Sequence, residues 1–190
     1  MSRYRVVGQR TLHGRLAAGA DLFLNEYESR VNSVESEGSI ESGGSFHFLL
    51  ASIMFSAFYV EGYINIIGSK LLAKAWPENL SWKEKIWLIY ALAKQEPKFG
   101  AEPLQTIQKL FKIRNGWAHA KPETVDGEFE YDILDNDSFD PLSSDFEKCI
   151  TPEFAKECAA EAKKFFECLL VVSGVEWPDT VTSAVESGVD

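Results

Sequence analysis

The sequence predicts an all-α fold, a helical bundle of about five helices in a single domain. In several long segments the apolar residues recur at steps of three and four, which is the period of an amphipathic helix. Prolines and capping residues mark the ends of these segments. Of the 190 residues 45% are hydrophobic and 25% are charged, which suffices for one core, expected over about residues 12–172.

The first predicted helix covers residues 12–34, and its apolar positions are three or four residues apart. The stretch 36–45 is rich in Gly, Ser and Glu and predicts a flexible connection. The apolar run 46–75 predicts a second, longer helix. It ends at Trp76 because the following residue is Pro77, and a residue before proline is pushed out of the α region.

Three further helices are predicted over residues 81–93, 103–121 and 152–172. The first of them begins with a capping-box pattern at Ser81, in which a glutamate follows three residues after the serine. The second has proline in its first turn and ends before another proline. The last begins with Thr151 as a cap, followed by proline and an acidic residue.

Residues 123–147, between the last two helices, carry ten acidic residues and no basic one. Phe129, Tyr131 and Ile133 alternate with polar residues, so the prediction is a long acidic loop or a small hairpin. Two roles stay open for this insertion: a solvated surface loop, or an acidic cover over a basic helix. Residues 173–190 are expected to form a frayed tail.

The charge is distributed unevenly. The net charge is −10 and the isoelectric point is near 4.9. Residues 1–69 carry a net charge of −2, residues 70–121 carry +6 and residues 122–190 carry −14. A protein that coats polyanions needs a broad basic face, so this class is excluded, whereas a narrow nucleic-acid site in the basic middle third is compatible with the sequence.

Cysteine usage and hydropathy indicate a cytoplasmic protein with no membrane anchor. The three cysteines, Cys149, Cys158 and Cys168, are odd in number and form no Cys-x-x-Cys motif, which is typical of a reducing compartment. No apolar segment follows the first residues, so no signal peptide is expected. The run 46–75 is long enough to cross a membrane, but its serines, glycines and asparagine favour the central helix of a bundle.

Glu61 is the only charged residue between Ser42 and Ser69. A buried carboxylate costs several kcal/mol unless it is paired. Glu61 therefore either lies at a solvent-facing edge or meets a cation from another helix. Asn65 follows one turn later on the same face and is a candidate supporting residue.

Arg114 is the candidate cation for Glu61. It lies three residues after Phe111, where the apolar stripe of its helix continues, and a guanidinium in such a position needs an acceptor. Asn115 and His119 are four residues apart and share a face, so three polar groups converge near the end of this helix.

The pattern Arg114-Asn115-x3-His119, before a helix-ending Lys-Pro, resembles the signature of the HEPN family. The run 58–65, with Glu61 and Asn65 among apolar residues, is similar to an earlier helix of that family. The resemblance implies one HEPN-like domain over residues 1–190 that dimerises so that two motif helices face one cleft. It also implies one of two roles, a metal-independent endoribonuclease or a non-catalytic interaction or nucleotide-binding module.

The chemistry of these side chains suits RNA cleavage by the 2′-OH of the RNA itself. Such cleavage needs a base, an acid and a cation for the phosphorane charge; histidine supplies either of the first two and arginine the third. We therefore expect His119 to act as acid or base, Arg114 to hold phosphate and Asn115 to orient them. One chain supplies one such histidine, which favours a homodimeric site.

The histidine and the lysines can each also have a role outside catalysis. His119 can instead cap the last carbonyls of its helix. Lys109, Lys112 and Lys121 either extend an RNA-binding surface or solvate a helix face. We expect no cofactor and no metal, because the histidines are scattered and no His-x3-His pattern occurs.

The expected partners are RNA, a second copy of the chain and an antitoxin or regulatory protein, in a defence, stress or toxin–antitoxin role. The net charge of −10 favours the alternative of a non-catalytic module, because RNA would approach against the overall field.

Overall fold

The computed structural model describes residues 3–8, 13–37, 42–119, 145–176 and 184–189. It confirms the all-α bundle with five main helices. They are α1 (His13–Glu37), α2 (Ser42–Leu72), α3 (Trp82–Leu92), α4 (Leu104–Ala118) and α6 (Pro152–Ser173). A 3-10 turn, η1 (Ala73–Ala75), extends α2, and a short helix, α5 (Asp145–Lys148), precedes α6.

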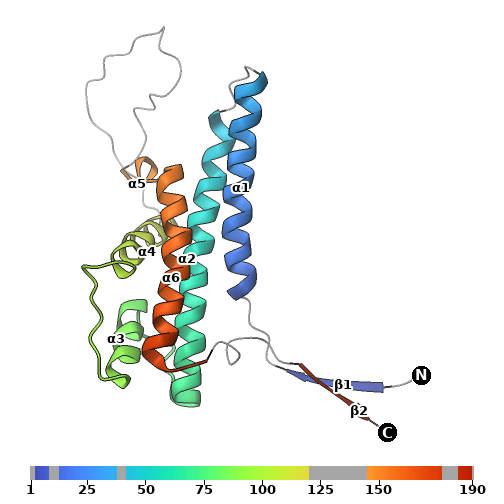
Figure 1. The fold of residues 1–190 in the computed structure, drawn as a ribbon, viewed down its shortest axis with the longest axis vertical. Coiled ribbons are helices and arrows are strands. Elements are labelled where there is room, and N and C mark those ends of the chain that lie inside the picture. Colours follow the sequence, from blue (N-terminus) through green and yellow to red (C-terminus); the bar gives the residue numbers. More distant parts are fainter. Residues whose placement is uncertain (1–2, 9–12, 38–41, 120–144, 177–183, 190) are drawn as a thin grey trace.

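The central element is α2, which packs against all four other main helices. Figure 1 shows α1, α2 and α6 as three long helices side by side, with α3 and α4 on the side of α2 and α6 away from α1. The core residues of α2 include Ile53, Val60, Tyr63, Ile64 and Ile67, all at most 1% exposed. This explains the low polarity of α2, since a helix surrounded by others has no wide face for charged side chains.

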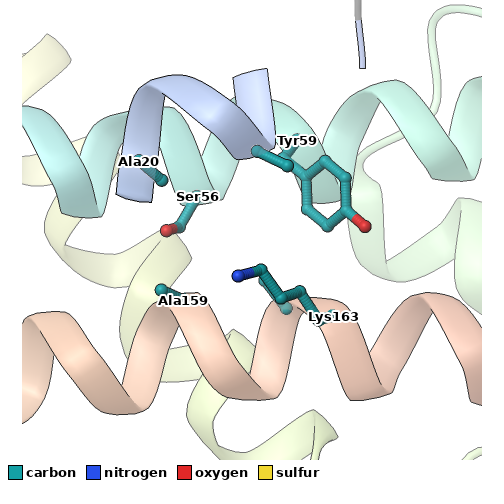
Figure 2. A pocket seen from close by; sticks show the side chains of 7 residues that line it. Ala20, Ser56, Tyr59, Ala159 and Lys163 are labelled. Carbon is teal, nitrogen blue, oxygen red and sulfur yellow. The ribbon is translucent and has the colours of Figure 1, made fainter. Parts of the chain in front are cut away.

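The three long helices meet along a seam of small side chains. Figure 2 shows Ala20 of α1, Ser56 and Tyr59 of α2, and Ala159 and Lys163 of α6 around a gap. The gap is too narrow to hold a water molecule, so it is a packing feature and not a ligand site.

The caps expected at two helix starts are confirmed. Ser81 accepts a hydrogen bond from the backbone N–H of Glu84, and the Glu84 carboxylate accepts one from the backbone N–H of Ser81. The Thr151 hydroxyl accepts a hydrogen bond from the backbone N–H of Phe154, with Pro152 in the first turn of α6. Each cap supplies a partner to a donor that the helix cannot satisfy internally.

The expected bounds of the connection between α1 and α2 are wrong. The predicted flexible connection 36–45 is shorter, because α1 continues to Glu37 and α2 begins at Ser42. Packing of α1 along α2 outweighs the low helix propensity of the glycines there.

The predicted frayed ends contain strands. β1 (Arg3–Gly8) pairs antiparallel with β2 (Ala184–Val189), from Arg3 opposite Val189 to Gly8 opposite Ala184. This two-stranded ribbon lies apart from the helical bundle (Figure 1). The expected hairpin around Phe129, Tyr131 and Ile133, and most of the acidic insertion 123–147, lie outside the described residues.

The segment Ser45–Ala75 is the one described helix long and apolar enough to cross a membrane, judged by length and composition. Half of its most apolar window is buried inside the bundle. That burial is compatible with a soluble protein, in which such a segment forms the core.

Candidate active site

The expected pair of Glu61 and Arg114 is confirmed. Nη2 of Arg114 on α4 donates a hydrogen bond to Oε2 of Glu61 on α2, at 3.0 Å. The Arg114 side chain is 26% exposed and the Glu61 side chain 37% exposed. The two interpretations of Glu61 therefore both hold in part, since it meets a cation and also lies at a solvent-facing edge.

Asn115 holds the same guanidinium from a second side. Nη1 of Arg114 donates to Oδ1 of Asn115 at 3.0 Å. A guanidinium has five N–H donors in a planar fork, so two contacts leave others for a ligand such as a phosphate. Glu61 and Asn115 thus fix the position of Arg114 and leave part of it accessible.

His119 lies one turn beyond Asn115 at the end of α4. It is the C-cap residue, and its backbone N–H donates to the carbonyl oxygen of Asn115 at 3.0 Å. Its side chain is exposed. Among the described residues the ring forms no hydrogen bond with the last carbonyls of α4, so the side-chain capping role gains no support.

The lysines predicted to bind RNA divide into two groups. Lys109 and Lys112 are exposed on α4, on the broad solvent-facing side that also carries Asn115 and His119. Lys121 lies outside the described residues. The exposed side of α4 therefore combines two lysines, an amide and an imidazole, with Arg114 at its edge toward α2.

Asn65, the expected supporting residue, has other partners. Its Oδ1 accepts hydrogen bonds from Nζ of Lys85 at 2.9 Å and from Nε1 of Trp76 at 3.3 Å. Lys85 is only 6% exposed, so this amide oxygen serves a buried ammonium on α3. Asn65 therefore connects α2 to α3, and within the part of the chain that the structure describes its hydrogen bonds do not reach Arg114.

Phe58 is a member of the site that was not assigned from the sequence. Its ring is 36% exposed, and the guanidinium carbon of Arg114 lies 5.9 Å from the ring centroid, within cation–π range. Phe58 precedes Glu61 by three residues, so both project from one face of α2. An exposed aromatic ring beside a cation suits an unpaired base next to its phosphate.

Trp117 anchors the end of α4. Its ring lies 6.0 Å from that of Phe46 near the start of α2. Its indole N–H is buried and finds no hydrogen-bond partner in the part of the chain that the structure describes. Arg114 and Trp117, three residues apart within the motif, thus both fasten the last turn of α4 to α2.

The described residues contain no group of three or more His, Cys, Asp or Glu side chains arranged to hold a metal ion. Comparisons with protein-family models, with curated proteins and with solved structures found no match for this chain. Membership of the HEPN family stays a prediction that depends on the motif residues and their arrangement.

Proposed function

We propose that the protein is a HEPN-like, metal-independent endoribonuclease. The observation that carries the proposal is the Arg114 guanidinium, held at 3.0 Å by Glu61 and at 3.0 Å by Asn115, with exposed His119 one turn beyond. A fixed cation and a titratable group at one helix end are the two elements that phosphodiester cleavage through the 2′-OH requires.

In the proposed reaction the 2′-OH of the RNA attacks the adjacent phosphorus. A base takes the proton of that hydroxyl, and the bond from phosphorus to the 5′-oxygen breaks. An acid returns a proton to the leaving 5′-oxygen, which gives a 2′,3′-cyclic phosphate and a 5′-hydroxyl. Arg114 stabilises the negative charge that builds up on the non-bridging oxygens, while Asn115 keeps it in place.

The site is proposed to form across a homodimer. The reaction uses a base and an acid, and each chain supplies one histidine in this motif. Two copies related by a dyad would bring two such histidines to one cleft. The exposed positions of Lys109, Lys112 and His119 leave this side of α4 open to RNA and to a second chain.

One observation favours the alternative function, a non-catalytic module that binds a protein or a nucleotide. The Glu61 carboxylate already neutralises part of the Arg114 charge, in a chain with a net charge of −10. A phosphate would then bind less tightly than to an unpaired arginine.

A direct experiment separates the two functions. Purified protein is incubated with structured and single-stranded RNA, and the products are analysed for 2′,3′-cyclic phosphate ends. Cleavage that disappears in both Arg114→Ala and His119→Ala supports the ribonuclease. Tight binding of a nucleotide or a protein without RNA cleavage supports the non-catalytic module. A biological role in defence, stress or a toxin–antitoxin pair belongs to the same proposal.

A further inference from the structure

A concave site lies at the opposite end of α4 from the motif. The connection between α3 and α4 and the C-terminal half of α6 enclose a groove of about 440 Å³. Tyr90, Leu104 and Val172 supply apolar surface to it. Both its volume and this mixture of apolar surface with a few polar groups are typical of ligand-binding sites.

The charged groups of the groove are mainly acidic. Glu96, Glu102 and Glu167 line it, against the single cation Lys98. The Glu102 carboxylate is already used, since it accepts hydrogen bonds from the backbone N–H and the hydroxyl of Thr106 at 3.2 and 3.1 Å. Glu96 and Glu167 form no ion pair with any described residue, so two carboxylates remain for a cationic ligand.

The groove is open along α6. Val171 lines it and is 83% exposed, the largest exposure among the described large hydrophobic side chains. A small ligand would normally be mostly enclosed by its site, whereas an open groove with an exposed apolar edge suits an amphipathic helical segment. We propose that this groove binds a cationic, amphipathic peptide segment of a partner protein, with apolar side chains on Val171 and Val172 and basic ones beside Glu96 and Glu167.

Among the described residues no segment of the chain itself suits the groove. Residues 122–190 carry a net charge of −14 and would be repelled by its carboxylates. The basic segment Arg3–Gly8 is already paired with Ala184–Val189. The motif lies at the far end of α4, about 20 Å away at ~1.5 Å per helical residue. This inference is therefore independent of the proposed ribonuclease activity.

Cys168 provides a reporter inside the groove. It lines the groove and is exposed, whereas Cys158 is buried, and burial raises the pKa of the Cys158 thiol and lowers its reactivity. In a Cys149→Ser variant a maleimide dye should therefore react with Cys168. The probe ligand is a synthetic helical peptide with a leucine face and a lysine face, and the measurements are its affinity and the rate of Cys168 labelling.

The peptide is expected to bind and to slow labelling of Cys168 several-fold. Glu96→Lys and Glu167→Lys should each weaken binding roughly tenfold, because each replaces an attraction by a repulsion. Glu78→Lys, an exposed charge reversal outside the groove, is the matched control and should leave binding almost unchanged.

Four results would overturn the inference. The first two are binding as tight as that of the probe by a peptide with glutamate in place of lysine, or by a lysine peptide without leucine. The third is protection of Cys168 from labelling by a small diamine to the same extent as by the probe. The fourth is protection of Cys168 when only the protein concentration is raised. Either of the first two results would show that the groove does not select a cationic, amphipathic peptide. The third result would make a small cation the ligand of the groove, and the fourth would make a second copy of the chain its occupant.

Discussion

Glu61 of α2 and Arg114 of α4 are 53 positions apart in the chain, and their side chains meet at 3.0 Å between Oε2 and Nη2. Asn115 holds the other terminal nitrogen of the same guanidinium at 3.0 Å. Two contacts from two helices leave the arginine little rotational freedom, and a cation fixed in advance loses less entropy when it binds phosphate.

Replacing Glu61 by Gln should cost about 1 kcal/mol of unfolding free energy or less, because both partners are partly exposed. This value is smaller than the several kcal/mol lost when one partner of a fully buried pair is removed. Urea unfolding of the variant measures it, and Glu26→Gln, which removes the exposed partner of Arg30, is the matched control. A loss of several kcal/mol would show that the pair behaves as a buried one.

His119→Ala and Arg114→Ala should each reduce RNA cleavage by about 10²–10⁴-fold while the helical circular dichroism stays at the parental level. Arg114→Lys should also be poorly active, since an ammonium cannot make the two-pronged contact of a guanidinium. The exposed residues His47 and Arg15 provide matched controls, and their alanine variants should cleave normally. Parental activity in both motif variants would assign any cleavage to another site.

Local chemistry explains which parts of the fold could be predicted from the sequence. The capping residues Ser81 and Thr151 act on backbone groups three residues away, so their patterns are visible in a short window. The ribbon of Arg3–Gly8 with Ala184–Val189 has no local signal, because each strand finds its partner at the other end of the chain.

Only those residues of the candidate site could be predicted that place an isolated charge on an apolar helix face. Glu61 and Arg114 are isolated charges on apolar faces, which indicates a pair. Asn65 was expected beside Arg114 and Phe58 was not assigned, because α2 is apolar around most of its circumference and its rotation relative to α3 and α4 leaves no trace in the sequence. In the structure Asn65 accepts a hydrogen bond from Lys85, and the Phe58 ring lies beside the Arg114 guanidinium.

Cleavage should survive EDTA, because the proposed acid, base and charge stabiliser are all side chains. It should leave a 2′,3′-cyclic phosphate on one product and a 5′-hydroxyl on the other. A substrate with one deoxyribose at the cleaved position should resist cleavage there, because the attacking hydroxyl is missing. Mass spectrometry of the products tests this, and a 3′-hydroxyl end would point to attack by water instead.

Phe58→Ala should weaken binding of single-stranded RNA by roughly 5- to 150-fold, the range for loss of ~1–3 kcal/mol of base stacking. Phe58→Trp should retain binding, since it keeps an aromatic face beside Arg114. Fluorescence anisotropy with an uncleavable deoxy-substituted oligonucleotide measures affinity apart from catalysis. Trp87→Ala removes a 48% exposed aromatic residue on α3 and is the control. Equal effects of Phe58→Ala and Trp87→Ala would remove the stacking role.

Mixed dimers test whether the site is shared between two chains. The proposed cleft uses His119 of both chains, one as acid and one as base. A heterodimer of one parental chain and one His119→Ala chain then has an incomplete site and should cleave no better than the His119→Ala homodimer. If each chain forms its own site, the same heterodimer keeps one complete site and should retain about half of the parental activity.

The mixing experiment uses differently tagged parental and His119→Ala chains, which are co-expressed and purified through both tags. The parental homodimer is the active reference, and the His119→Ala homodimer is the inactive baseline. Cleavage by the heterodimer no higher than the inactive baseline supports a site that is shared between two chains. Heterodimers that retain about half of the parental activity would show that Arg114 and His119 act within one chain.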